Sequence, residues 1–405
     1  MDLAVFAPVG GKYKLEYYFP DLGVIGYDDP KVELLMGEDK YYTDFVVPIY
    51  PGISEDFGEQ IVEEHFQHFH AEILFQIADA WALTRIPDLA KQDRIRWVIQ
   101  PPIDFLDPLP QYLVDKLSPA IRVVPWVKDG YERLVKHGLN NVAEPIPLGI
   151  NTELWKPQDR SQFANTMRDL GFGYDTFNIS IVAANQYGRK AWEQTLRGIK
   201  LFIEKRPDVL VRLYLHTHVY IGDGWDMDQL ITHLGLGEYT RSARPYYMTV
   251  GLYNEYQLML IHALADVVIN AGLEGWGYAT VQSQATGTPV IGLNAGATKE
   301  LVESGVLVPP YSDMLTPNLL RRADPHPIHI AEALEKIYET PRNEFKKGVE
   351  FTHKNFAWPI VIEKWKKLFK EVDEELEHKC IKSVRYPPRP SERALELSNQ
   401  VQEIL

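Results

Sequence analysis

The stretch LEGWGYATVQSQATGTPVIG occupies residues 273–292 and combines a turn, a helix and a strand. An apolar segment at 266–270 leads into it, and two glycines closely follow the acidic residue Glu274. A short helix is expected from about Gly277, and Gly-Thr-Pro ends it before the apolar strand 289–293. This order of elements is typical of a parallel sheet covered by helices. Because ligands of such sheets bind at the carboxyl ends of the strands, Glu274 is expected at a ligand site.

The same alternation runs through the second half of the chain. The sequence predicts strands at 179–183 and 210–215, and helices at 192–204, 227–234 and 255–263. The strands are apolar and rich in β-branched residues, as expected of strands buried on both faces. The second half therefore predicts a parallel sheet with helices on both sides.

The first half alternates less regularly, and residues 15–53 resist assignment. The predicted strands are 3–8, 73–78, 95–99 and 121–124, and the predicted helices are 59–69, 109–117 and 127–136. The segment 144–157 carries three prolines and little periodicity, so it is a candidate linker. Pro359 opens a last long helix. The sequence predicts two α/β domains joined near residue 150.

Composition excludes several classes of protein. The chain has 405 residues and a net charge of −14, which argues against nonspecific nucleic-acid binding and against a basic membrane-docking surface. Cys380 is the one cysteine, so no intrachain disulfide can form and a reducing compartment is expected. The N-terminus has no basic region before its apolar run, and no apolar run reaches the length of a membrane span. We expect a cytoplasmic protein.

The chemistry of the turn points to a ligand with both phosphates and hydroxyls. Gly275 and Gly277 let the backbone approach a ligand, and the start of the next helix offers free N–H groups and a positive dipole end. Glu274 would repel a phosphate but can accept hydrogen bonds from hydroxyls. Gln282, further along the helix, could reach a second hydroxyl-bearing group. The alternative is that Glu274 caps the helix and Gln282 is a surface residue.

A second loop supports the prediction of an anion-binding site. Arg189 and Lys190 directly precede the helix 192–204, although cations avoid helix N-termini unless an anion neutralises them. The alternative is a solvated charge pair. Gly10 and Gly11 follow the first strand, and they could form a third close approach or only a turn. Neither a GxGxxG fingerprint nor a GxxxxGK[ST] phosphate loop occurs.

These features occur together in one known group of enzymes. EGWGYATVQSQATGTPVIG resembles the glutamate-glycine motif of retaining glycosyltransferase family 4, often called group 1, and GVLVPP at 305–310 is similar to the segment just after that motif. NQYGRKAWEQTLRGIKLFIEKRPDVLVRLYLHT at 185–217 resembles the Arg/Lys loop, helix and next strand of that family. IPLGINTELWKP at 146–157 is similar to the interdomain segment, and PPIDFLDPLP at 101–110 to a first-domain segment. The match covers about residues 101–358.

The resemblance implies a GT-B fold, an α/β fold with two Rossmann-like domains whose parallel sheets face each other across a cleft. The implied domains are 1–148 on the acceptor side, completed by the helix 359–385, and 149–358 on the donor side, with a tail at 386–405. A nucleotide diphosphate sugar would bind in the cleft, and an acceptor hydroxyl would attack with retention of configuration. No metal and no further cofactor would be needed. The acceptor, whether saccharide, lipid or protein glycan, is not specified.

The resemblance also implies roles for single residues. Glu274 would contact the transferred sugar, and Lys190, helped by Arg189, would hold the leaving diphosphate. The other implied donor-binding residues are Gly10, Gly11, Gly275, Trp276, Gly277, Tyr278 and Gln282. Trp276 and Tyr278 could pack on the sugar or only on their own domain.

The chain departs from the family pattern at three places. Gln282 replaces the second glutamate of the motif, which holds the ribose hydroxyls, and Asn185 stands where the family has an arginine. The first-domain histidine is missing, and Gln100 or Asp104 lies near its place, so Asp104 is a candidate on the acceptor side. These departures favour one alternative, a non-catalytic GT-B protein that binds a nucleotide sugar or a partner.

Three enzyme classes and a metal site have less support. A sugar-nucleotide epimerase or a phosphorylase could share the fold, and a nicotinamide oxidoreductase would need the absent glycine fingerprint. His65, His68 and His70 invite a metal site but lack the HExxH pattern, and 70 does not share a helix face with the other two. His216 and His218 alternate at a strand end and could line the donor pocket.

Overall fold

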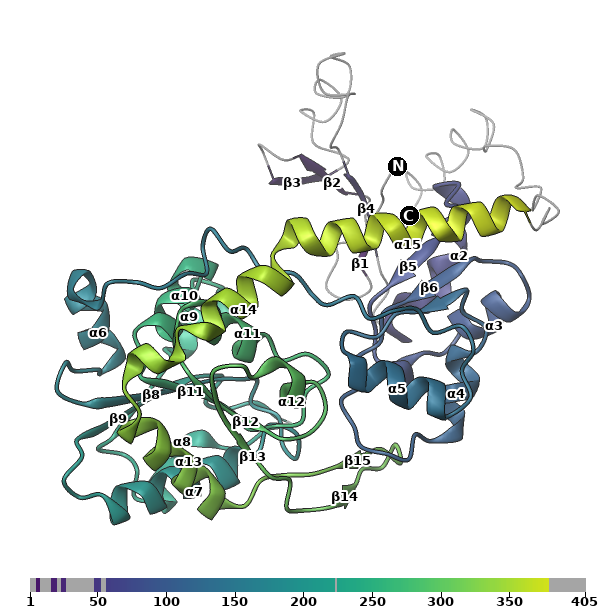
Figure 1. Ribbon diagram of the computed structural model, residues 1–405. Helices are drawn as coiled ribbons and strands as arrows, with labels where there is room; N and C mark the ends of the chain where they lie inside the picture. The colour runs from purple at the N-terminus through teal and green to yellow at the C-terminus, as the bar shows by residue number, and fades with distance from the viewer. Residues whose placement is uncertain are drawn as a thin grey trace. The chain divides into compact units, whose positions relative to one another are not determined.

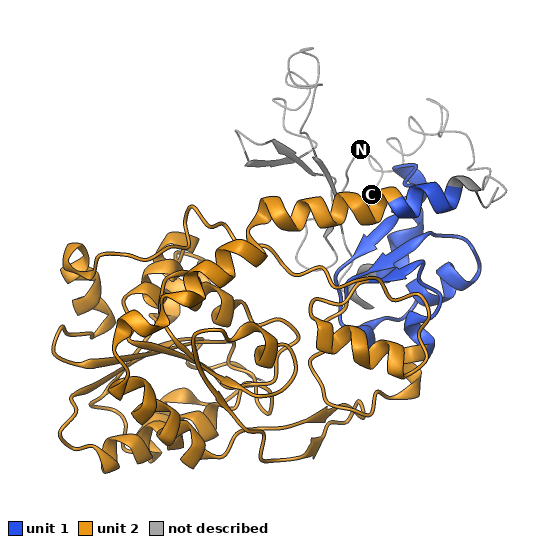
Figure 2. Ribbon diagram, in the orientation of Figure 1, with its two compact units in different colours: residues 1–100, 115–123, 371–405 blue, residues 101–114, 124–370 orange. Residues whose placement is uncertain are grey.

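The structure is a computed structural model that describes residues 5–7, 16–19, 23–26, 47–51, 56–222 and 224–378. Gly10, Gly11, Cys380 and the predicted tail 386–405 lie outside the described residues. The chain divides into two compact units (Figure 2). Unit 1 comprises 1–100, 115–123 and 371–405, and unit 2 comprises 101–114 and 124–370. The domain boundary at 148 and 149 stays a prediction.

Unit 2 is built on a six-stranded parallel sheet of strand order β10-β9-β8-β11-β12-β13 (Figure 1). The strands are β8 Phe177–Val182, β9 Val211–His216, β10 Thr240–Ser242, β11 Val267–Asn270, β12 Val290–Leu293 and β13 Gly305–Val308. The predicted strands 179–183, 210–215, 266–270 and 289–293 are thus confirmed to within two residues. These predictions are correct because a strand that is buried on both faces appears in the sequence as a continuous apolar run.

Helices cover both faces of this sheet. Ile269 of β11 packs into one core with Trp192 and Leu334, whereas its neighbour Val268 packs into the other with Trp276. Opposite directions for successive side chains are what a strand imposes. The helices of unit 2 are α5 Lys128–Lys136, α6 Ala164–Leu170, α7 Trp192–Lys205, α8 Met227–His233, α9 Pro245–Thr249, α10 Glu255–Ala263, α11 Tyr278–Ala285, α12 Thr298–Leu301, α13 Pro327–Glu339 and α14 Lys347–Phe356, with 3-10 turns η3 Arg160–Phe163 and η4 Arg342–Phe345. The helices predicted at 192–204, 227–234 and 255–263 and from about Gly277 are confirmed.

Unit 1 contains two smaller sheets. One is parallel, in the order β5-β6-β7, with β5 Leu74–Gln76, β6 Trp97–Ile99 and β7 Arg122–Val123. The other has the order β1-β4-β2-β3, with β1 Val5–Ala7, β2 Glu16–Phe19, β3 Gly23–Gly26 and β4 Val47–Pro51. Its strand β2 runs antiparallel to β3 and β4. The sequence did not predict β2, β3 and β4, which fall in the unassigned segment.

The helices of unit 1 are short. They are α2 Val62–His68 and α3 Ile86–Lys91, with 3-10 turns η1 Asp56–Ile61 and η2 Ala80–Ala82. The predicted helix 59–69 therefore begins as a 3-10 turn. Two helices have residues in both units, α4 Gln111–Leu117 and α15 Trp358–His378. No helix among the described residues has the length and apolar character needed to span a membrane.

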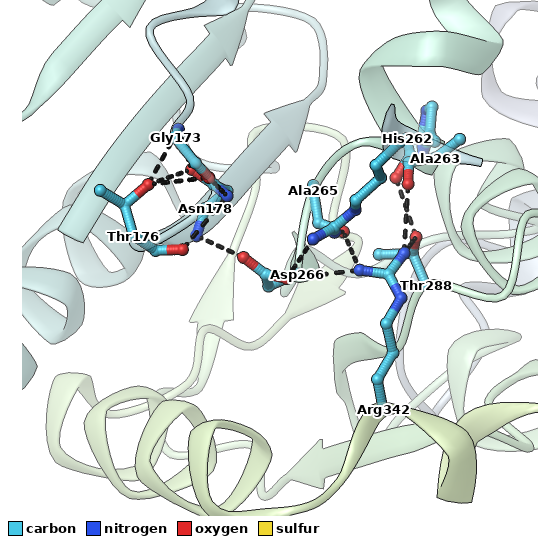
Figure 3. A network of polar contacts seen from close by, with 10 residues as sticks. Gly173, Thr176, Asn178, His262, Ala263, Ala265, Asp266, Thr288 and Arg342 are labelled. Carbon is cyan, nitrogen blue, oxygen red and sulfur yellow. Dashed lines mark hydrogen bonds and ion pairs between the residues drawn. The ribbon is translucent and has the colours of Figure 1, made fainter. Parts of the chain in front are cut away.

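Two features of unit 2 lie outside its main sheet. The antiparallel hairpin β14 Met314–Leu315 and β15 Arg321–Arg322 follows β13. At the amino ends of β8 and β11, Asp266 joins a network of polar contacts (Figure 3). Arg160 and Arg342 both contact its carboxylate, at 2.7 and 3.3 Å.

Candidate functional site

The turn between β11 and α11 lies at the carboxyl edge of the six-stranded sheet, as predicted. β11 ends at Asn270, and the Asn270 side-chain amide donates to the hydroxyl of Thr280 at 2.9 Å, which ties the strand to the helix. Gly277 precedes α11 with φ of +87°, a left-handed conformation that favours glycine. The N-terminus of α11, with the backbone N–H groups of Tyr278 and Ala279, therefore follows this turn directly.

Two glycines let this turn pack directly on neighbouring backbone. A Cβ on Gly272 would lie 2.6 Å from the carbonyl oxygen of Arg189. A Cβ on Gly275 would lie 3.0 Å from the backbone nitrogen of Ile103 and 2.9 Å from the Cβ of Pro102. The turn is thus held between the loop that carries Arg189 and the segment that carries Asp104. The space beside the Gly275 Cα is filled by the chain itself.

Glu274 forms ion pairs with both predicted cations. Lys190 donates to its Oε1, and Arg189 Nη1 lies 3.5 Å from its Oε2. The loop carrying both cations follows β8, which pairs directly with β11, so the two loops are neighbours at one edge of the sheet. The alternative that Glu274 caps α11 is wrong, because the N-cap residue is Gly277 and the Glu274 carboxylate accepts from Arg189 and Lys190 instead. The alternative that Arg189 and Lys190 form a solvated charge pair is wrong too, because the Lys190 side chain is only 11% exposed.

Asp104 joins the same group of charges. Its Oδ2 lies 3.3 Å from Arg189 Nη1 and 4.0 Å from Arg322 Nη2. We call Asp104, Arg189, Lys190, Glu274 and Arg322 the charged cluster. The sequence pattern did not reveal Arg322, because nothing in the residues around it marks it. Only the hairpin β14–β15, which follows the last strand of the sheet, places it beside Asp104.

Asp104 is deeply buried within the charged cluster. The residue is 5% exposed, and burial raises the pKa of its carboxyl, while Arg189 and Arg322 act in the opposite direction. Its second oxygen, Oδ1, is buried and has no hydrogen-bond partner among the described residues. A buried carboxylate oxygen with unused acceptor capacity is suited to a hydroxyl donor.

The chain between the cations and α7 is strained. Ala191 has φ of +49°, although left-handed backbone costs a residue with a side chain about 1–2 kcal/mol. Strained backbone of this kind gathers at ligand sites. The nearby Asn185, at the place of the family arginine, donates to the carbonyls of His218 and Trp225 at 2.9 and 2.7 Å. Asn185 therefore holds the loop after β9 rather than standing free for an anion.

The aromatic residues of the motif take different positions. Trp276 is 2% exposed, and its ring packs edge-on against Phe356 at 5.1 Å, so its side chain belongs to the core. Tyr278 is 41% exposed and donates to the carbonyl of Gly149 at 3.4 Å. Gln282 is half-buried on α11. Donor contacts by these residues stay predictions, and one by Trp276 would use its backbone.

The histidines singled out in the sequence form no metal site among the described residues. His216 packs edge-on against Tyr253 at 4.8 Å, and burial, with His218 second, lowers the pKa of its ring to about 4. His216 is therefore neutral at pH 7. Across the described residues, which include His65, His68 and His70, no three His, Cys, Asp or Glu side chains gather as a metal site would require.

The sequence has distant relatives among known proteins, although no family model matches it. The chain is 25% identical over 274 residues to a D-inositol 3-phosphate glycosyltransferase of Corynebacterium diphtheriae, a match that covers 64% of this chain and 57% of that protein. The chain spans about half the length of the curated relatives it matches.

Solved structures match over more of the chain. The Anabaena protein HepE in complex with UDP-glucose aligns with a TM-score of 0.60 at 15% identity, over 80% of this chain and 86% of that one. The fold is GT-B. A glycosyltransferase from Rickettsia africae aligns with a TM-score of 0.59 at 13% identity, over 77% and 80%. The predicted GT-B fold class is confirmed, and at these identities the likeness shows the fold alone.

Proposed function

We propose that the chain is a glycosyltransferase that moves a sugar from a nucleotide diphosphate sugar to an acceptor hydroxyl. The observation that carries the proposal is the charged cluster at the carboxyl edge of the sheet. It places two cations and a helix N-terminus beside two buried carboxylates. The names of the relatives, all glycosyltransferases, support the same reaction.

The ion pairs suggest how the donor would bind. Lys190 and Arg189 are held by Glu274 in the described structure. A diphosphate carries more negative charge than one carboxylate and would draw both cations to itself. Glu274 would then be free to accept hydrogen bonds from hydroxyls of the transferred sugar. This explains an acidic residue beside a phosphate site, because it serves as counter-ion before binding and as sugar ligand afterwards.

The same groups would promote the reaction. As the bond to the anomeric carbon breaks, negative charge grows on the leaving diphosphate. Lys190, Arg189 and the first turn of α11 would stabilise that charge, and they are fixed in place before the reaction. Asp104 Oδ1 would accept a hydrogen bond from the acceptor hydroxyl. Retention of configuration, a hexose as the transferred sugar and independence of metal are further parts of this proposal, and they rest on the family resemblance.

Three predictions from the sequence also belong to the proposal. Gly10 and Gly11 would border the diphosphate, and the domains 1–148 and 149–358 would supply acceptor and donor sides. The single cysteine supports a cytoplasmic location. The names of the relatives make inositol 3-phosphate the first acceptor to try.

A second candidate is a GT-B protein that binds a nucleotide sugar without turnover. Gln282 favours it, because a neutral amide replaces a carboxylate on the ribose and gives up a charge-assisted hydrogen bond. The two candidates differ in chemistry and not in binding.

The test is release of nucleoside diphosphate from UDP-, GDP- and ADP-sugars, with EDTA present and with inositol 3-phosphate or simple sugars as acceptors. Turnover of one donor series supports the transferase. Binding of a nucleotide sugar, seen as thermal stabilisation, without any release would favour the second candidate. Neither binding nor release in any series would contradict both.

A further inference from the structure

The hairpin β14–β15 is fastened to the segment that carries Asp104. The Leu106 amide donates to the Arg321 carbonyl at 2.7 Å, and the Tyr112 hydroxyl donates to the Asn318 carbonyl at 2.8 Å. These two contacts fix the second strand of the hairpin and the turn before it. The guanidinium of Arg322, on β15, is therefore held at Asp104, and its side chain is 14% exposed.

Arg189, one of the two guanidinium neighbours of Asp104, also pairs with another member of the charged cluster. Arg189 contacts Asp104 at 3.3 Å, but it also contacts Glu274 at 3.5 Å and donates to the side chain of Gln186 at 2.7 Å. If Arg189 turns to a donor diphosphate, it leaves Asp104. A buried carboxylate that loses its counter-ion is strongly disfavoured. Something must therefore hold Asp104 when the donor binds.

We propose that Arg322 is a positioning residue that acts through Asp104, keeping this carboxylate paired while Arg189 moves to the diphosphate of the donor. The inference rests on the proposed function and deepens it. Arg322 Nη2 lies 4.0 Å from Asp104 Oδ2, the same oxygen that Arg189 approaches at 3.3 Å, so a positive charge stays beside the carboxylate when Arg189 leaves. Donor binding then depends on a residue that does not touch the donor.

The proposal predicts a particular dependence on pH. The charged groups that act on Asp104 are Arg189, Arg322, Glu274 and Lys190. In Arg322→Gln the Asp104 carboxyl loses a cation, so its pKa rises further above the ordinary value. At low pH Asp104 is then neutral and no longer retains Arg189, whereas at high pH it is charged and does. The loss of donor affinity in Arg322→Gln should therefore shrink as the pH falls.

The experiment is calorimetric titration with UDP, GDP and ADP, using whichever the unaltered chain binds most tightly. Arg322→Gln should weaken binding about tenfold at about pH 8, and this loss should shrink as the pH is lowered stepwise. Arg321→Gln is the matched control. The neighbouring Arg321 side chain pairs with Asp313 rather than with Asp104 and donates to the Asp107 carbonyl at 3.5 Å, so the nucleotide affinity of this variant should stay unchanged. In the Asp104→Asn variant, adding Arg322→Gln should leave the nucleotide affinity almost unchanged.

Each outcome decides one point. An equal loss in the Asp104→Asn background would overturn the inference, because Arg322 would then act on the nucleotide directly. No loss of nucleotide affinity at about pH 8, or a loss that grows as the pH falls, would overturn it as well. If Arg322→Gln does not fold, Asp104→Asn is compared with the double variant, because a neutral residue 104 needs no counter-ion. Equal nucleotide affinities in these two variants would support the inference, and a further loss in the double variant would overturn it. If the unaltered chain binds none of the nucleotides, the proposed function itself fails.

Discussion

The two edges of the six-stranded sheet use the same residue types for opposite purposes. At the amino edge Asp266 pairs with Arg160 and Arg342 and accepts from the amide of Asn178 at 2.8 Å (Figure 3). Arg342 also donates to the carbonyls of Ala263 and Ala265, at 3.1 and 3.2 Å. At the carboxyl edge Arg189, Lys190 and Arg322 pair with the carboxylates of Asp104 and Glu274. One edge is fixed in part by backbone partners, and the other, held by ion pairs between side chains, is where we propose that the donor binds.

The amino edge of the sheet also offers space for a ligand. An open groove of about 720 Å³ lies at the amino edge, lined by Asp208, Asp266, Tyr338 and Arg342 among others. The groups of Asp266 and Arg342 that could bind a ligand there are already hydrogen-bonded to the protein. A site requires polar groups whose partners can be exchanged, and volume does not supply them.

The largest expected effect is at the carboxyl edge. Lys190→Ala should lower the rate of transfer about 10²–10³-fold, because one donor to the developing charge is removed. The measurement is initial rate with the donor that the chain turns over. Lys200→Ala, on α7 and exposed beside Glu204, is the control and should keep full activity. Full activity in Lys190→Ala would remove this residue from the site.

A change at the amino edge should affect stability and not catalysis. Asp266→Asn removes the charge that Arg160 and Arg342 share and should lower the free energy of unfolding by about 1–3 kcal/mol. Activity of the folded fraction should stay the same. Denaturant unfolding and initial rates check both parts. Asp208→Asn, in the same groove but 64% exposed, should change stability by less than about 0.5 kcal/mol. A loss of rate in folded Asp266→Asn would mean that the two edges are not separate in function.

The smallest effect concerns the ribose. Gln282→Glu restores a carboxylate on the half-buried face of α11 and should tighten nucleoside diphosphate binding by about 1 kcal/mol, roughly fivefold. Calorimetry measures the change. Inorganic pyrophosphate has no ribose and serves as the control ligand, whose affinity should not rise. Weaker nucleotide binding in this variant would place Gln282 away from the ribose.

The sequence predicts the sheet edge better than it predicts the charged cluster. Strands β8 and β11 are apolar runs, so their carboxyl ends, and with them Lys190 and Glu274, could be located from the pattern alone. Arg322 could not, because its place depends on a hairpin fastened to a distant segment. Trp276 shows a second limit, since a tryptophan beside glycines fits both a sugar platform and a core residue. Only the position of Phe356 resolves which role its ring takes.

The most direct test of the account is a crystal structure of the chain with a bound nucleoside diphosphate and EDTA. The account predicts Lys190 Nζ and Arg189 Nη1 within about 2.7–3.2 Å of phosphate oxygens. It also predicts that the Lys190–Glu274 ion pair is broken and that Arg322 still contacts Asp104. A nucleotide bound elsewhere, with the Lys190–Glu274 pair intact, would contradict the claim that the carboxyl edge exchanges its ion pairs for a donor.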